Sequence, residues 1–329
     1  MKPVALTMGD PAGIGCEVTL KAWKELREEL SFFLIGDLTH VAHMAQGKGV
    51  PITPIDAPHE AVAAMREGLP VLKHPLPAPA PAGRPDPANS LAIVEIIRRG
   101  VDIVRRGEAS ALCTNPINKK VLRTGTKFDF PGHTEFLAHL CGARRPVMML
   151  ACPELRVVPV TIHIPLHDVP RKLTTDLIEA TVRVTHRALI EDFGIEDPRI
   201  AIAGLNPHAG EGGEMGHEER AVIAPAFERL EQDGIGVHGP MSADTMFHPV
   251  ARRSYDVAVC MYHDQALIPI KTLDFDGGVN VTLGLDFVRT SPDHGTAYDI
   301  ASTGTASPRS LIAALRMAAD LGARRESRK

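Results

Sequence analysis

Short apolar runs alternate with amphipathic stretches along nearly the whole chain, a pattern typical of an α/β protein. A buried strand is predicted at Val4–Met8, and apolar residues recur at helical spacing behind it from Ile14 to Leu30. The other predicted strands are the apolar runs at 32–35, 109–113, 147–151, 157–162, 199–203, 257–261 and 279–283. Helices are predicted from about residue 89 and over 174–192, 218–231 and 308–321. The alternation predicts a mostly parallel sheet, with ligand sites outside the carboxyl ends of its strands.

Three histidines follow directly, or after a short turn, on predicted buried strands. They are His163, His208 and His263. Imidazole is a good ligand for divalent transition metals, and three protein ligands with an open position are typical of a catalytic metal centre. The three lie 45 and 55 residues apart, without a local motif. A shared metal therefore requires the three strands to end together, and the alternative is a structural role for each histidine.

Two acidic residues and one glycine-rich segment accompany these histidines. Asp264 follows His263 directly, and Asp244 lies in a Ser-Ala-Asp-Thr string. Either carboxylate could orient an imidazole, carry a proton or cap a turn. The segment 206–214 is too rich in glycine for an ordinary connection, so its backbone is expected to approach something closely or to adopt positive φ.

Three further groups of residues could bind an anion. The loop 9–15 links a strand to a helix, so its N–H groups could hold an anion, although a tight turn explains it equally well. It matches neither the dinucleotide fingerprint nor a P-loop. His133 and Thr134 begin a predicted helix, where Thr134 could instead be an N-cap. Lys271, Asn280 and Arg289 offer cationic and neutral donors suited to an oxyanion, although each alone could be a solvated surface residue.

Composition narrows the class of protein. Of 329 residues, 44% are hydrophobic and 23% charged, as in a soluble globular protein of about two domains. A net charge of −4 and 4% aromatic residues argue against a nucleic-acid partner. The longest apolar runs fall far short of the ~20 residues of a membrane span, and no signal peptide is expected. Five cysteines without a C-x-x-C pattern favour a reducing, cytoplasmic location.

Seven strings, in order along the chain, closely resemble the 4-hydroxythreonine-4-phosphate dehydrogenase family of vitamin B6 biosynthesis. They are Met8–Gly15 (MGDPAGIG), Gly132–Glu135 (GHTE), Gly204–Gly213 (GLNPHAGEGG), Ala243–Thr245 (ADT), Tyr262–Gln265 (YHDQ), Gly278–Gly284 (GVNVTLG) and Arg289–Ala297 (RTSPDHGTA). The resemblance implies an α/β, two-domain fold like that of isocitrate and isopropylmalate dehydrogenases, with mostly parallel sheets and a cleft between the domains. The first domain would be discontinuous, with residues 1–125 and 285–329. The second, residues 126–284, would carry the metal ligands and the dimer interface.

The resemblance also implies roles for the residues named above. His163, His208 and His263 would bind one divalent ion per subunit (Zn, Mg or Co), and NAD or NADP would bind outside any Rossmann domain. Substrate contacts fall on His133, Thr134, Lys271, Asn280 and Arg289. Asp244, Asp264 and Lys271 are the candidate catalytic residues. The enzyme would be a homodimer with its active site at the subunit interface, and its substrate a small phosphorylated hydroxy acid.

The reaction implied is oxidation of 4-phosphooxy-L-threonine at C3, followed by decarboxylation to 3-amino-2-oxopropyl phosphate. Relatives in this family act on 4-phospho-D-threonate or 4-phospho-D-erythronate, and the strings above do not separate these substrates. A phosphoester hydrolase with a three-histidine metal centre is a more distant alternative, which would release inorganic phosphate and need no nicotinamide. A metal-binding protein without catalytic activity is a further alternative.

Overall fold

The computed structural model describes residues 2–328 and divides by its contacts into two compact units. Unit 1 is Met1–Pro146 with Leu285–Lys329, and unit 2 is Val147–Gly284. Residues 126–146, which the sequence analysis placed in the second domain, group with unit 1. Contacts with the helix at Ser90–Arg105 of unit 1 account for this grouping. The guanidinium of Arg98 on that helix lies 5.3 Å from the centroid of the Phe136 ring.

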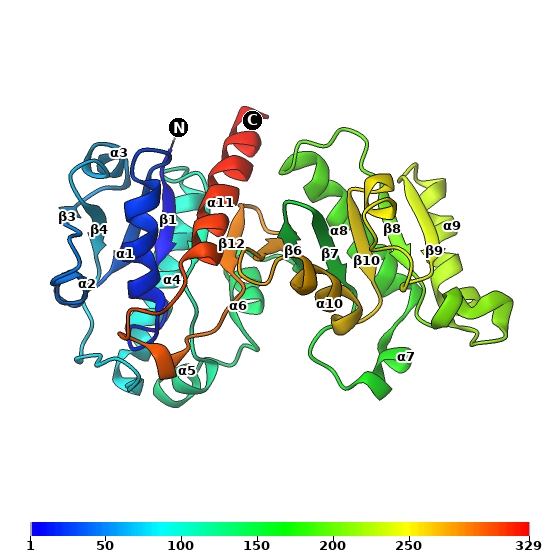
Figure 1. Ribbon diagram of the computed structural model, residues 1–329, viewed down its shortest axis with the longest axis horizontal. Helices are drawn as coiled ribbons and strands as arrows, with labels where there is room; N and C mark the ends of the chain where they lie inside the picture. The colour runs from blue at the N-terminus through cyan, green and yellow to red at the C-terminus, as the bar shows by residue number, and fades with distance from the viewer. Residues whose placement is uncertain (1, 329) are drawn as a thin grey trace. The chain divides into compact units, whose positions relative to one another are not determined.

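Unit 1 contains six sheet strands in which every neighbouring pair is parallel, in the order β3-β4-β2-β1-β5-β12. Figure 1 labels β1, β3, β4 and β12 of these strands. Its strands are β1 (Val4–Thr7), β2 (Phe32–Gly36), β3 (Ile52–Ile55), β4 (Leu69–Lys73), β5 (Leu112–Thr114) and β12 (Arg289–Pro292). Its α-helices are α1 (Gly15–Leu26), α2 (Leu38–Ala45), α3 (Ala61–Ala64), α4 (Ser90–Arg105), α5 (Lys119–Gly125), α6 (His133–Cys141) and α11 (Arg309–Ser327). Helices α1 and α11 pack against each other, and α4 packs on β1.

Unit 2 contains a mixed sheet in the order β11-β6-β7-β10-β8-β9, antiparallel in the first two pairings and parallel afterwards. Its strands are β6 (Val147–Cys152), β7 (Leu155–Pro159), β8 (Ile200–Ala203), β9 (Val237–Met241), β10 (Val257–Cys260) and β11 (Val279–Leu283). Its α-helices are α7 (Val169–Lys172), α8 (Thr175–Glu191), α9 (Ala224–Gln232) and α10 (His263–Leu273). Because β7, β8 and β10 run parallel, their carboxyl ends face the same edge, and His163, His208 and His263 follow those ends.

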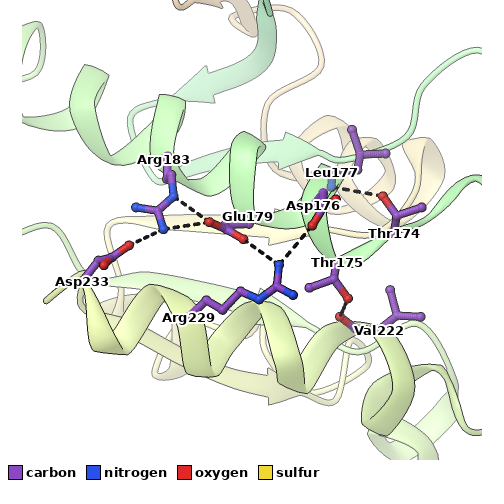
Figure 2. A network of polar contacts seen from close by, with 9 residues as sticks. All are labelled: Thr174, Thr175, Asp176, Leu177, Glu179, Arg183, Val222, Arg229 and Asp233. Atoms are coloured by element: carbon purple, nitrogen blue, oxygen red, sulfur yellow. Dashed lines mark hydrogen bonds and ion pairs between the residues drawn. The ribbon is translucent and has the colours of Figure 1, made fainter.

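A network of ion pairs joins α8 to α9 and the residue after it (Figure 2). Arg183 donates to Glu179 at 2.8 Å and pairs with Asp233, while Arg229 donates to Asp176 and Glu179 at 3.0 and 3.3 Å. At the start of α8, the Thr174 hydroxyl caps the helix by accepting the N–H of Leu177. Pairs as exposed as these contribute little singly, so we regard the network as fixing how the two helices face each other.

The loop between β1 and α1 is a packing turn. Asp10 N–H donates to the Pro116 carbonyl at 2.8 Å, and Ile14 N–H donates to the Thr296 carbonyl at 3.0 Å. Gly9 has φ +71°, and a Cβ there would lie 2.4 Å from that same Pro116 oxygen. Since several N–H groups of the loop bond within the protein, the tight-turn interpretation of residues 9–15 holds.

None of the helices in the described residues is long and apolar enough to cross a membrane.

Candidate functional site

Two of the three strand-end histidines lie side by side. The ring centroids of His163 and His263 are 6.0 Å apart, and both rings line a hollow of about 250 Å³ in unit 2 together with Tyr262 and Asp264. His163 has φ 55°, which turns the chain sharply after β7. His263 is the first residue of α10, a helix that the apolar pattern did not predict. Because α10 begins three residues after the last residue of β10, the helix fixes the backbone conformation at His263.

His208 lies on a left-handed turn after β8. His208, Ala209 and Glu211 have φ of 50°, 52° and 42°, and the neighbouring glycines also have positive φ. This confirms the expectation that the glycine-rich segment 206–214 adopts positive φ. The ring of His208 is exposed, and its Nδ1 lies 3.2 Å from Glu211 Oε2.

The donor chemistry of this cluster fits a divalent transition metal. In two of the three histidines a carboxylate engages Nδ1, since His263 Nδ1 lies 2.7 Å from Asp264 Oδ1 and His208 pairs with Glu211. Metal-binding histidines commonly use the other nitrogen and keep such an orienting partner. The three rings are not gathered into one ligand set, because within residues 2–328 no group of three or more His, Cys, Asp or Glu is placed to hold an ion. The structure thus brings together His163 and His263 but not His208.

The two candidate aspartates of unit 2 lie beside different histidines. Asp264 contacts His263, as described above. Asp244 accepts a hydrogen bond from the Ser242 hydroxyl, which lowers the pKa of its carboxyl, and the charge of His208 acts in the same direction. Both carboxylates are exposed, so they are available to solvent or a ligand.

In unit 1, His133 is the first residue of α6 and Thr134 the second. The N-cap is Gly132, so the interpretation of Thr134 as N-cap is wrong. The Nε2 atom of His133 is buried without a hydrogen-bond partner. Burial, and after it the charge of Arg289, hold the pKa of this imidazole well below its usual 6.5. A neutral ring with an unsatisfied nitrogen at a helix start is suited to meet a polar ligand.

Arg289 is the first residue of β12 and only 3% exposed. Its Nη2 donates to Thr114 Oγ1 at 2.6 Å, which ties it to the neighbouring strand β5. Burial lowers the pKa of the guanidinium to about 10, so it still carries its charge at neutral pH. A buried cation beside a neutral imidazole is a candidate anion site within unit 1.

The other two predicted anion contacts belong to unit 2. Asn280 lies on β11, and its Oδ1 is buried without a hydrogen-bond partner. Lys271 lies in the last turn of α10, with its ammonium 5.2 Å from the centroid of the exposed Phe275 ring. The apolar pattern did not predict α10, because Pro269 lies inside the helix and proline normally interrupts one.

A family model described as pyridoxal phosphate biosynthetic protein PdxA matches residues 28–318, which is most of the chain. The chain belongs to the PdxA family. A curated relative from Paracoccus denitrificans, named 4-hydroxythreonine-4-phosphate dehydrogenase, is 55% identical over 98% of this chain and 99% of its own length. The crystal structure of a 4-hydroxythreonine-4-phosphate dehydrogenase from Klebsiella pneumoniae is 37% identical, with a TM-score of 0.89, and covers 98% of this chain and 100% of its own.

Membership of the PdxA family confirms the family resemblance found in the sequence. The expected likeness to β-decarboxylating dehydrogenases, the class of the isocitrate and isopropylmalate enzymes, is confirmed as a likeness of fold. The crystal structure of a β-decarboxylating dehydrogenase from Thermococcus kodakarensis has a TM-score of 0.50 at 15% identity, covering 98% of this chain and 83% of its own.

One feature of this PdxA chain has no counterpart in the sequence analysis. An open hollow of about 620 Å³ in unit 1 is lined by Lys119, Lys120 and Arg123 of α5 and, across from them, by Gly295 and Thr296. No Asp or Glu is among its lining residues, so the hollow is cationic. It lies beyond the carboxyl ends of β5 and β12, where open α/β sheets bind ligands. The signal was present in the sequence as Asn118-Lys119-Lys120 just after a predicted strand.

Proposed function

We propose that this protein is an NAD(P)-dependent 4-hydroxythreonine-4-phosphate dehydrogenase. The observation that carries the proposal is 55% identity over nearly the full length to a relative of that name. The substrate loses a hydride from C3 and a proton from the hydroxyl on C3. The nicotinamide accepts the hydride, and the product is a β-keto acid. That acid loses CO₂, a proton replaces it on carbon, and 3-amino-2-oxopropyl phosphate results.

A divalent ion would be held by His163, His208 and His263. When bound, it would polarise the C3 oxygen of the substrate and favour both steps. The chain's own contribution is to present the imidazoles in the right tautomer, which Asp264 and Glu211 support through Nδ1. Asp244 and Asp264 are candidates to accept and return the protons of the reaction, with Lys271 as a third.

The anionic groups of the substrate would bind to His133, Thr134, Lys271, Asn280 and Arg289. Arg289 supplies a buried positive charge, and a charged donor aimed at an anion in a dry environment is stronger than one in water. His133, kept neutral by burial, can donate a hydrogen bond without adding a charge. The proposal requires the residues of unit 1 and those of unit 2 to serve the same reaction.

The phosphates of the dinucleotide would bind in the cationic hollow of unit 1. Lys119, Lys120 and Arg123 supply the positive charge that a pyrophosphate or a ribose phosphate needs. The fold offers no glycine-rich dinucleotide fingerprint, so charge on side chains replaces the usual backbone cradle. The proposal also includes a cytoplasmic homodimer with its active site at the subunit interface.

A coupled assay tests the proposal. Purified protein is given 4-phosphooxy-L-threonine with NAD or NADP, with and without a chelator, and reduced nicotinamide is followed by absorbance. We expect turnover that the chelator abolishes and a divalent ion restores. Parallel arms with 4-phospho-D-threonate and 4-phospho-D-erythronate identify the substrate, and release of inorganic phosphate without reduced nicotinamide would instead indicate a hydrolase.

A further inference from the structure

The turn that carries His208 is built around a buried carboxylate. Glu219 is 5% exposed, and its Oε1 accepts hydrogen bonds from the backbone N–H groups of Leu205 at 2.8 Å and Asn206 at 2.7 Å. Its Oε2 accepts from the Asn206 side chain at 3.0 Å. The chain then returns so closely that a Cβ on Gly210 would lie 2.6 Å from Glu219 Oε2. One side chain therefore fixes both the entry and the middle of the turn.

The backbone of this turn is one that most residues avoid. His208 and Ala209 have φ of 50° and 52°, a left-handed conformation that is unfavourable for residues other than glycine. Strained conformations of this kind persist only where surrounding contacts impose them, and they concentrate at functional sites. The bonds from Glu219 to Leu205 and Asn206 are contacts of that kind.

The segment that carries Glu219 is itself fixed by contacts with the rest of unit 2. It is the first residue of a short π-helix, Glu219–Ile223, an uncommon conformation that often marks functional sites. The hydroxyl of Thr175, at the start of α8, donates to the Val222 carbonyl of this π-helix at 3.0 Å (Figure 2). Ile223 is fully buried, so the π-helix is anchored on two sides. The carboxylate thus projects from a rigid support toward the turn.

A second buried side chain joins the ends of β8 and β10. Gln265 accepts the N–H of Met261 on Oε1 and donates from Nε2 to the Gly204 carbonyl, both at 2.7 Å. Met261 lies two residues before His263, and Gly204 four residues before His208. The Met261 carbonyl in turn accepts from the hydroxyl of Thr161 at 2.8 Å. The segments that lead to all three histidines are therefore linked by a buried polar network.

We propose that Glu219 and Gln265 are positioning residues for the histidine cluster. Acting through the backbone at 204–206 and at Met261, they set where His208 and His263 present their rings to a divalent ion. The inference rests on the metal role in the proposed function. The pattern of bonds argues for positioning beyond general stability, because these bonds end on residues that lie two to four positions before His208 and two before His263.

Cobalt binding tests this inference. Co²⁺ is titrated into the full-length protein by calorimetry, and the visible absorption of the cobalt-loaded protein is recorded. The variants are Glu219→Gln and Gln265→Leu, with Glu17→Gln as the matched control. Glu17 is an equally buried glutamate of unit 1 that accepts from Lys21 Nζ at 3.0 Å and from the Ala306 N–H at 3.1 Å.

All three variants are expected to lower Tm, but only Glu219→Gln and Gln265→Leu should weaken Co²⁺ binding and alter its absorption bands. The expected loss is about 10–100-fold in affinity, as for other groups that orient metal ligands. Wild-type affinity and bands in both variants would overturn the inference while leaving the proposed function intact. If Glu219→Gln does not fold, Gln265→Leu decides alone. A wild-type protein that binds no divalent ion and turns over in chelator would overturn both.

Discussion

The two units hold their candidate residues in opposite ways. In unit 1, His133 and Arg289 begin regular elements, α6 and β12, and protein encloses their polar atoms. In unit 2, His163 and His208 themselves have positive φ. The side chains of His208 and His263 are 60% and 39% exposed. In unit 1, Arg289 and the Nε2 atom of His133 are buried on regular elements, whereas the histidines of unit 2 are half-buried or exposed at the ends of strands.

This difference shows which cluster is complete before a ligand arrives. The desolvation of Arg289 and His133 is already part of the folding free energy, and it fixes their charge states as cation and neutral ring. In unit 2 the third imidazole is not yet with the other two. A bound ion would supply the free energy that gathers it. In the proposed function, unit 1 would thus be preorganised for an anion, while unit 2 would be completed by its cation.

The largest expected effect comes from breaking the histidine cluster. His263→Ala should lower kcat by about 10³-fold or more, because a metal ion contributes several kcal/mol to such a reaction and each 1.4 kcal/mol is a factor of ten. Tm should change little, because the ring is partly exposed. The control is His167→Ala, a neighbouring histidine whose side chain is 73% exposed. Full activity of His263→Ala after chelation and dialysis would remove His263 from the metal site.

The next largest effect should come from the buried cation of unit 1. Arg289→Ala should lower kcat/KM by about 10–100-fold, since hydrogen bonds to charged groups are worth roughly 1.5–3 kcal/mol. Divalent-ion affinity should stay at the wild-type value, which separates the two clusters. Arg105→Ala, an exposed arginine paired with Asp286 in the same unit, is the matched control. An unchanged kcat/KM in Arg289→Ala would exclude it from the site.

A smaller effect is expected in the cationic hollow. Lys119→Ala combined with Lys120→Ala should raise KM for the dinucleotide by about three- to tenfold, because exposed charges interact weakly through water. The rise should shrink in high salt, which screens the wild-type interaction. Lys127→Ala removes a nearby exposed lysine outside the hollow and should leave KM unchanged. Equal KM values in the double variant and wild type would place the dinucleotide elsewhere.

The sequence was sufficient to predict the strands and helices whose apolar residues recur at regular spacing. The strands at β1, β2, β6, β8, β10 and β11 and the helices α4 and α8 lie where periodicity predicts them, within a few residues. Strands with polar or proline positions were missed. β12 reads Arg-Thr-Ser-Pro and is fully buried, while β3 and β4 contain Pro54 and Pro70. Their burial comes from neighbouring strands, which no local pattern records.

The candidate site was predictable as a set of residues but not as an arrangement. The sequence identified His163, His208 and His263 because each follows a predicted strand, and the carboxyl ends of parallel strands lie at the same edge of a sheet. The buried partners Glu219 and Gln265 were not named, because Glu219 lies in an ordinary-looking helical segment and its role depends on a turn 13 residues earlier. The burial of Arg289 and of the His133 Nε2 atom could not be predicted from the sequence either, since polar groups are normally exposed.

The smallest effect concerns the neutral ring of His133 and tests the preorganisation of unit 1. Because its pKa is lower in the folded than in the unfolded protein, the unfolded chain binds the proton first as pH falls below 6.5. His133 therefore contributes stability above that pH, which is lost as pH falls toward the folded pKa, by at most about 1.4 kcal/mol per pH unit.

In urea unfolding between pH 7.5 and 5.5, His133→Gln should lose stability less steeply than wild type. Other histidines with lowered pKa, such as His40 and His294, titrate in both proteins, so the difference in slope isolates His133. Equal slopes for His133→Gln and wild type would mean that the folded and unfolded states bind a proton on this ring equally, so that folding does not hold the ring neutral. The contrast between a preorganised anion site in unit 1 and a cation site in unit 2 that needs its ion would then fail.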